Sequence, residues 1–150
     1  MTTRERIESD FTREFKARNA SAVSTLRMLR AAVKNLEIDK MKTLEEAEVV
    51  DVVGREVKKL RDSLESFKTG GREDLVEQAR QEIALIETYL PAQLDDAALN
   101  DMVQKTAASM GPLTEKDFGR LMKEVMKVTA GKADGQKVSA AVKAALAPKQ

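Results

Sequence analysis

The chain contains no cysteine, no histidine and no tryptophan, and it has only one tyrosine and four phenylalanines among 150 residues. Without cysteine there is no disulfide and no thiolate nucleophile. Without cysteine and histidine there is neither a Cys or His zinc site nor a catalytic triad that uses imidazole as its base. No glycine-rich phosphate loop and no Gly-x-Ser-x-Gly turn occurs. We therefore expect no metal ion and no cofactor, and no catalytic residue can be named.

Long apolar segments are missing as well. The sequence has no run of about eighteen apolar residues and no short apolar stretch behind a basic start, so we expect neither a membrane span nor a signal peptide. Hydrophobic residues still make up 42% of the chain, which is enough for a folded protein. The sequence predicts a folded cytoplasmic protein without a membrane partner.

The net charge of +1 conceals an uneven distribution. Residues 1–42 carry 10 basic and 6 acidic side chains, residues 43–94 carry 7 and 12, and residues 95–150 carry 9 and 7. Two basic ends therefore flank an acidic middle. Because the potential at a surface depends on the local arrangement of charge, a polyanion remains a possible partner despite the nearly neutral total.

Apolar residues return every three or four positions in each periodic segment, and no segment alternates long enough for a strand, so the fold class is all-α. The first helix carries Ile7, Phe11 and Phe15 at steps of four. The predicted boundaries are, in chain order, a capping box at Thr2 and Glu5, a break at residues 18–20, a cap at Ser21, a second capping box at Thr43 and Glu46, a stop at Gly70 and Gly71, and a stop at Pro91. Three shorter helices are expected at residues 96–109, 115–129 and 136–147.

The third and fourth helices have matching apolar seams and a short turn between them, which predicts a long helical hairpin. A coiled coil between two chains is the alternative, but a partner so close in sequence favours pairing within one chain. We expect an N-terminal helical bundle over residues 1–94 and a three-helix C-terminal subdomain over residues 95–150, together a multihelical array. Gly119 lies inside a predicted helix, where glycine is unfavourable, so we expect it to approach another backbone closely; Gly54 raises the same question.

A row of basic residues defines one face of the helix expected at residues 115–129. Lys116, Arg120, Lys123 and Lys127 lie within about 60° of one another around the helix axis, and no acidic residue shares this stripe. Lys132 follows in a glycine-containing turn and Lys137 at the start of the next helix. A second row, Arg27, Arg30 and Lys34, runs along an edge of the second helix beside its apolar stripe. Such rows suit phosphates, although a solvated helix face is the alternative interpretation.

Five strings together resemble the YqeY family. They are STLRMLRAAVKN at residues 24–35, EVKKLRDSLESFKTGGREDL at 56–75, ETYLPAQL at 87–94, KDFGRLMKEVM at 116–126 and GKADGQKVSAAVK at 131–143. This family is similar to the C-terminal tail of the B subunit of the tRNA-dependent Asp/Glu amidotransferase. The resemblance covers almost the entire chain and implies a two-part helical array, a GatB/YqeY-like domain.

The resemblance also implies contact with tRNA, because the amidotransferase tail engages tRNA. The cationic residues within the matching strings are Arg27, Arg30, Lys123, Lys132 and Lys137, and the helical periodicity adds Arg120 and Lys127 to this candidate nucleic-acid-binding set. The chain lacks the Ser-Ser-Lys amidase signature and the metal and ATP residues of the amidotransferase body. The carbon–nitrogen ligase activity associated with the family, which uses glutamine as amide donor, is therefore not carried over.

Three functions remain open at this point. The first is a stand-alone tRNA-binding module without chemistry of its own. Its expected partner is tRNA or another folded RNA, and an amidotransferase or an aminoacyl-tRNA synthetase is a further candidate partner. The second is an adaptor that docks on an enzyme or ribosomal partner through its acidic middle hairpin. The third is an amidotransferase component with catalytic residues, for which the sequence offers no positioned base or nucleophile. With so few aromatic residues, we expect no stacking platform and hence recognition of folded RNA by shape.

Overall fold

The computed structural model describes residues 1–129 and 131–147; residues 130 and 148–150, which belong to the expected C-terminal subdomain, lie outside the described part. Within the described residues the chain forms seven α-helices, one short 3-10 helix and no strand, which confirms the all-α class. The chain packs as two compact units, Met1–Leu90 and Pro91–Gln150. Each unit has its own apolar core.

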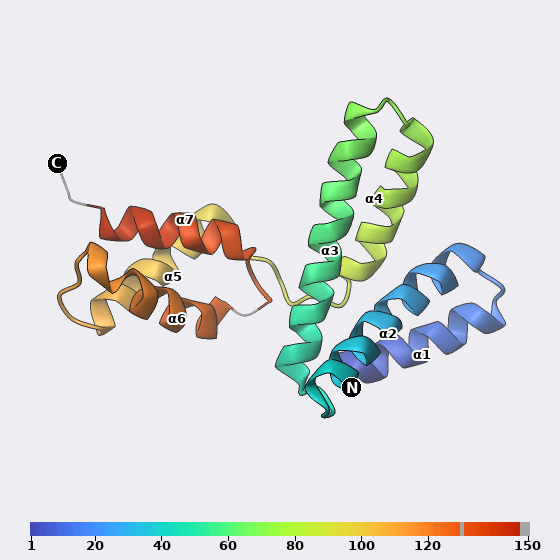
Figure 1. Cartoon of the computed structure of the whole chain (residues 1–150), viewed down its shortest axis with the longest axis horizontal. Helices are drawn as coiled ribbons and strands as arrows, with labels where there is room; N and C mark the ends of the chain where they lie inside the picture. The colour runs from blue at the N-terminus through green and yellow to red at the C-terminus, as the bar shows by residue number, and fades with distance from the viewer. Residues whose placement is uncertain (130, 148–150) are drawn as a thin grey trace. The chain divides into compact units, whose positions relative to one another are not determined.

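Four helices build the first unit: α1 (Thr3–Lys16), α2 (Ala20–Lys40), α3 (Glu46–Thr69) and α4 (Glu73–Glu87). The helices α3 and α4 form the predicted antiparallel hairpin, and α1 and α2 form a second one (Figure 1). The core contains Leu26, Leu29 and Val33 from α2, facing apolar side chains of α1, α3 and α4. Burying each such side chain contributes on the order of 1.5 to 3 kcal/mol. Because α2 contacts each of the other three helices, this stripe joins the helices of the unit.

Local capping interactions explain where the helices begin. Thr2 caps α1 through the predicted capping box with Glu5. The other two expected caps are wrong. Asn19, whose side chain accepts from the Ala22 amide, caps α2 in place of Ser21, and Glu45 precedes α3 in place of Thr43. In both cases the helix boundary differs by a residue or two from the expected one.

Polar contacts along α1 help to hold it in the first unit. Glu46 at the start of α3 accepts hydrogen bonds from the backbone amide and the hydroxyl of Thr3. At the end of α4, the buried Tyr89 donates its hydroxyl hydrogen to Asp10, and the Arg6 guanidinium lies over the Tyr89 ring at 5.2 Å. Desolvation by burial, together with Asp10, raises the pKa of Tyr89, so this hydroxyl stays a donor.

The connection from α2 to α3 is held by carboxylates. The Glu48 carboxylate accepts from Lys40 Nζ at 2.8 Å and from the Glu45 amide at 2.9 Å, and Lys42 Nζ lies 3.0 Å away. The hydrogen bond from Lys40 is the main cause that lowers the pKa of Glu48 to about 2. Glu37 accepts from Arg4 and from the Leu44 amide, and the Arg4 contact is the main reason that its pKa is lowered too.

The second unit consists of α5 (Asp96–Ser109), η1 (Glu115–Asp117), α6 (Phe118–Thr129) and α7 (Gly135–Leu146). The helix expected at residues 115–129 thus starts with a single 3-10 turn. The core of the second unit comprises Leu99, Val103, Leu121, Val125, Val138 and Val142. The segment before α5 is tied to the turn after α6, because the Leu94 amide donates to the Lys132 carbonyl and Gln93 Nε2 to the Gly131 carbonyl, both at 2.8 Å. These bonds explain why residues 91–94, which we assigned to the first subdomain, belong to the second unit.

Two further expectations need correction. Among the described residues, a Cβ atom added at Gly119 would meet nothing within 4 Å, so the close backbone approach expected there is not found, and the same holds at Gly54. Phe15, expected to continue the apolar stripe of α1, is 59% exposed, whereas Ile7 is buried and Phe11 packs at the edge of the core. Phe15 lies near the end of α1, beyond the point where the core covers that helix.

Replacing Gly119 with alanine should therefore stabilise the protein. Because the added methyl group meets no neighbour and alanine has the higher helix propensity, Gly119→Ala should raise the free energy of unfolding by up to about 1 kcal/mol. Gly54→Ala, in the middle of α3, should have a similar effect. Urea unfolding followed by circular dichroism measures both changes, and destabilisation by either alanine would contradict the open surroundings of that residue.

The α2–α3 connection should be sensitive to acid. Since the pKa of Glu48 is lowered from 4.5 to about 2 on folding, its contribution to stability is complete above about pH 4.5 and is lost as the pH falls toward 2. In Glu48→Gln, the free energy of unfolding should be lower at neutral pH and should depend less on pH between these values. Urea unfolding at a series of pH values tests this. As a control, Glu65→Gln removes an exposed carboxylate near Lys68 and should leave the pH dependence as it is.

Candidate nucleic-acid interface

The first candidate surface is an open groove between α1 and α2 with a volume of about 540 Å³. It brings together the predicted residues Arg27 and Arg30 with Lys34, which all lie on α2, and with Arg4 from α1. The acidic side chains Glu8 and Glu37 also line it, and the remaining lining residues are Ile7, Ala31 and Val33. We call this surface the α1–α2 groove. Four cations against two carboxylates leave it with a positive charge.

Packing of α2 directs these cations into the groove. Leu26, Leu29 and Val33 form the buried stripe of α2, and the residues that follow them by one position, Arg27, Arg30 and Lys34, lie on the adjacent edge toward α1. Lys and Arg side chains also shield apolar surface with their aliphatic stems while the charged end stays in solvent. The basic row of the sequence thus becomes one wall of a groove.

Ion pairs engage half of the cations in the α1–α2 groove. Arg30 Nε lies 2.8 Å from Glu8 Oε1, and Arg4 Nη1 lies 3.0 Å from Glu37 Oε1. The salt bridges of the described residues include no acidic partner for Arg27 or Lys34, and both side chains are exposed. These two cations are therefore available to an anionic ligand without the loss of an existing ion pair.

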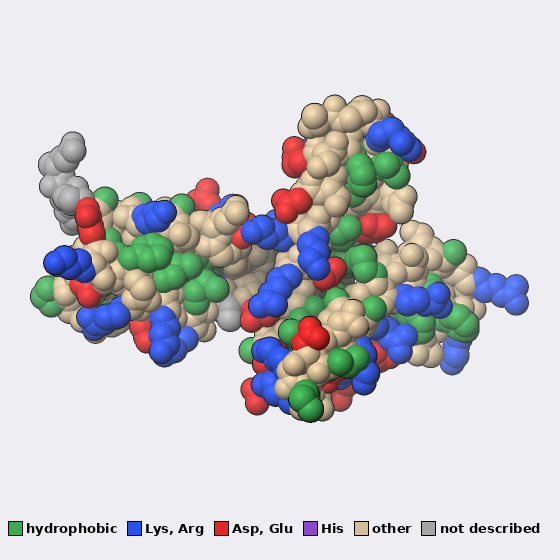
Figure 2. All heavy atoms as spheres, in the orientation of Figure 1, with side chains coloured by type: hydrophobic (Ala, Val, Ile, Leu, Met, Phe, Trp, Pro, Cys, Tyr) green, Lys and Arg blue, Asp and Glu red, His purple; other side chains and the backbone are tan. Residues whose placement is uncertain are grey.

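The second candidate surface lies on η1 and α6. Lys116, Arg120, Lys123 and Lys127 are all exposed, while Leu121 and Val125 on the opposite side of α6 are completely buried. We call these four cations the α6 row. Figure 2 shows that Lys and Arg side chains on the second unit have acidic side chains beside them.

Two of those neighbouring acids pair with members of the α6 row. Arg120 Nη1 lies 3.1 Å from Asp117 and Lys127 Nζ lies 3.0 Å from Glu124, both at a spacing of three residues. The Thr114 amide is the main cause that lowers the pKa of Asp117, and Arg120 adds to it. Asp117 and Glu124 lie outside the stripe itself, as the sequence indicated, but their side chains reach its edge. Exposed pairs of this kind contribute about 0 to 1 kcal/mol, so a phosphate can replace the carboxylate at little cost.

The remaining predicted residues lie in and after the turn that follows α6. Lys132 is half-buried, and its carbonyl fixes Leu94. Lys137, on α7, is exposed and lies 3.9 Å from the exposed carboxylate of Asp96. Arg27 and Arg30 therefore belong to the first unit, and the five predicted cations with higher numbers belong to the second.

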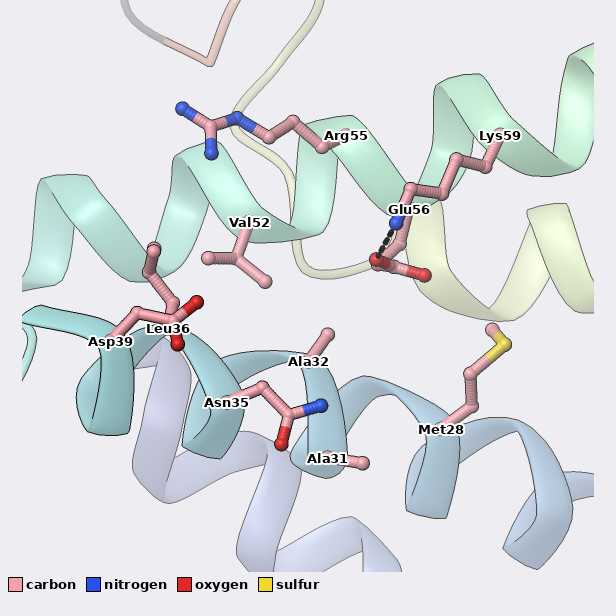
Figure 3. Close-up of a pocket in the computed structure, with 10 residues that line it drawn as sticks. All are labelled: Met28, Ala31, Ala32, Asn35, Leu36, Asp39, Val52, Arg55, Glu56 and Lys59. Atoms are coloured by element: carbon pink, nitrogen blue, oxygen red, sulfur yellow. Dashed lines mark hydrogen bonds and ion pairs between the residues drawn. The ribbon is translucent and has the colours of Figure 1, made fainter.

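A second groove in the first unit lies between α2 and α3 (Figure 3). Its volume is about 410 Å³, and apolar side chains such as Met28, Ala32 and Val52 line much of it. The side chain of Glu56 is only 11% exposed and accepts from Lys59 Nζ at 3.1 Å. Figure 3 shows the Glu56 carboxylate between the two helices, whereas Arg55 extends away from α2. Two of the strings quoted above, residues 24–35 and 56–75, meet across this groove.

Sequence reasoning missed Arg4 and Glu56 as parts of these grooves. Arg4 is one of many charged residues in the first helix, and only the packing of α1 on α2 brings it close to Glu37. Glu56 stands between Arg55 and Val57 in an amphipathic helix, and nothing in the local pattern marks it as buried.

The charged groups of these surfaces are cations and carboxylates that lie in ion pairs or in solvent. No group of three or more His, Cys, Asp or Glu residues in the described part of the chain could hold a metal ion. Glu56 has Lys59 as its hydrogen-bonded partner, and Asp39, the other acid that lines the α2–α3 groove, comes from α2. None of the helices in residues 1–129 and 131–147 is long and apolar enough to cross a membrane.

Comparison with known proteins identifies the family. The chain is 32% identical over 87 residues to the protein named "Altered inheritance of mitochondria protein 41, mitochondrial" of Eremothecium gossypii, a match that covers 57% of this chain and 48% of that protein. Proteins of the same name from Lachancea thermotolerans and Kluyveromyces lactis are both 29% identical, over 85% and 92% of this chain and 68% and 72% of their own lengths. The chain thus spans about half of the first relative and about 70% of the other two.

A family model described as "Yqey-like protein" matches residues 4–146, from the first turn of α1 to the last residue of α7. The match includes both grooves' lining residues and the α6 row. The resemblance drawn from the five strings is confirmed: the chain belongs to the YqeY-like protein family.

Proposed function

We propose that the chain is an RNA-binding helical module, with tRNA or another folded RNA as its partner, and that it carries out no bond-making step itself. The observation that supports this most is the α1–α2 groove, where Arg27, Arg30, Lys34 and Arg4 line one open surface. A phosphate backbone is a row of negative charges, and each phosphate neutralised by Lys or Arg releases a counterion. A groove with excess positive charge on a rigid helix pair suits such a ligand.

The α6 row is the second contact surface in the proposal. Its cations are exposed, and its acidic neighbours Asp117 and Glu124 are on the flank rather than within the row. Lys132 and Lys137 extend the positive charge toward α7. Contacts to phosphates position a nucleic acid without reading its sequence, so specificity in this proposal comes from the shape of the folded RNA.

A protein-docking adaptor is the second candidate function, and the α2–α3 groove favours it. Met28 is 37% exposed above a floor that includes Ala32 and Val52, a suitable surface for an apolar side chain of a protein partner. The relatives' name refers to mitochondria and their inheritance and names no ligand. An RNA-binding module would act wherever tRNA occurs, in the predicted cytoplasm or in an organelle such as the mitochondrion of the relatives' name.

The proposal predicts a steep dependence of RNA affinity on salt. If four to six cations each neutralise a phosphate, a plot of log affinity against log salt concentration should have a slope of about −3 to −5. The magnitude of this slope should fall by about 2 to 3 in the triple variant Arg120→Gln, Lys123→Gln, Lys127→Gln. It should fall by about 1 to 2 in the double variant Arg27→Gln, Lys34→Gln. Fluorescence anisotropy with labelled tRNA at several salt concentrations measures these slopes.

A matched control removes the same charge elsewhere. Lys58→Gln, Lys68→Gln, Lys105→Gln changes three exposed lysines outside both surfaces and should leave the slope as in the unmodified chain. An equal loss in the control and in the α6 variant would mean that binding follows net charge alone. A flat salt response of the unmodified chain would exclude the proposal.

Treatment with ribonuclease separates the two candidate functions. If the chain binds RNA, proteins that co-purify with the tagged chain from a lysate should be held by RNA that both bind. These proteins should no longer co-purify after ribonuclease treatment. An adaptor would instead retain its protein partners. Met28→Glu, which places a charge in the α2–α3 groove, should then release any partners that resist ribonuclease, whereas it should leave RNA affinity nearly unchanged.

A further inference from the structure

Two phenylalanines form a stacked pair on α1. The ring centroids of Phe11 and Phe15 lie 6.0 Å apart with an angle of 26° between the ring planes. Phe11 is half-buried at the edge of the core, but Phe15 is 59% exposed. A single exposed apolar side chain needs no explanation on its own. This one continues an ordered stack from the core into solvent.

Arginines from α2 cover the inner ring of the stack. The Arg30 Cζ atom lies 4.2 Å and the Arg27 Cζ atom 5.9 Å from the centroid of the Phe11 ring. Both distances are within the range of a cation–π contact. Glu8 fixes the Arg30 guanidinium at 2.8 Å, whereas Arg27 is exposed and has no acidic partner among the salt bridges of the described residues. A planar aromatic surface and a free guanidinium therefore lie side by side.

This combination matches the two parts of a nucleotide. An unpaired base is a flat aromatic ring that stacks on phenylalanine or on an arginine plane, and its phosphate binds a guanidinium. In a regular duplex the bases are covered by their neighbours, so a duplex offers phosphates but no free ring face. The surrounding charge favours a nucleotide over an apolar protein segment, because the exposed residues Lys16 and Arg18 lie one and three positions after Phe15.

We propose that Phe15, with Phe11, Arg27 and Arg30 beside it, forms a stacking platform for one unpaired base of the bound RNA. This inference rests on the proposed RNA-binding function and narrows its ligand from folded RNA in general to RNA with an unstacked nucleotide. It also revises the expectation, based on the small number of aromatic residues, that the chain has no such platform. Two phenylalanines suffice because they lie one turn apart on α1 beside the arginines of α2.

A tryptophan at position 15 reports on stacking directly. The chain contains no tryptophan, so Phe15→Trp introduces a single tryptophan, whose emission is separate from that of Tyr89, at the proposed platform. A short single-stranded RNA should quench its fluorescence on binding, while a blunt, fully paired RNA duplex should bind through phosphates with little quenching. The matched control is Phe67→Trp on α3, at a half-buried ring outside the proposed platform and outside both grooves. Its fluorescence should be quenched by neither RNA.

Substitutions that separate aromatic from merely apolar character complete the test. Phe15→Leu should lower the affinity for the single-stranded RNA about tenfold, as should Phe15→Ala, whereas Phe15→Tyr should retain it. None of the three removes a charge, so the salt slope should not change, and duplex affinity should stay the same. Because Phe15 is exposed, circular dichroism and urea unfolding should show folded variants.

The outcomes distinguish this inference from the function on which it rests. Salt-dependent RNA binding that Phe15→Leu does not weaken, or a tryptophan at position 15 that no RNA quenches, would overturn the platform and leave the RNA-binding proposal intact. Retention of a ribonuclease-resistant protein by the unmodified chain, lost in Phe15→Ala, would assign the exposed ring to a protein partner instead. If no RNA binds at low salt, both proposals are wrong.

Discussion

Burial of one stripe of α2 governs the first unit. Leu26, Leu29 and Val33 fill the space between α1, α3 and α4, and the period of the helix then determines where the other side chains of α2 go. Arg27 and Arg30 are directed toward α1, so the same packing that stabilises the unit also builds one wall of the α1–α2 groove. A change in this stripe would therefore alter stability and the position of the cations together.

The carboxylates of the chain limit and position its positive charge. Glu8 and Glu37 hold Arg30 and Arg4 in place within the α1–α2 groove, and Asp117 and Glu124 do the same at the flank of the α6 row. Most of these pairs are exposed enough for solvent to weaken them, so they orient the cations without binding them strongly. A phosphate of a ligand can therefore replace the carboxylate as the partner of such a cation. Cations that are oriented but weakly paired suit transient binding of a polyanion.

Family membership and physical reasoning support different parts of the argument. The family model covers almost the entire chain and establishes which family it belongs to, while the relatives' names describe no ligand or reaction. The two grooves, the α6 row and the Phe11–Phe15 stack come from the structure of this chain. The RNA-binding proposal rests on those surfaces, and the amidotransferase resemblance supplies the kind of RNA for which the test is designed.

The sequence by itself determined the helices and the division into two helical groups, because the 3.6-residue period and glycine or proline stops act over a few residues. Two of its caps were wrong by a residue or two: Asn19 caps α2 in place of Ser21, a residue of similar capping ability, and at α3 the Glu45 amide donates to the Glu48 carboxylate. It also marked the basic rows, which depend on the geometry of single helices. Only the tertiary structure placed Arg27 and Arg30 over Phe11 and brought Tyr89 to Asp10, because contacts between residues far apart in sequence depend on how the helices pack, which no local pattern contains.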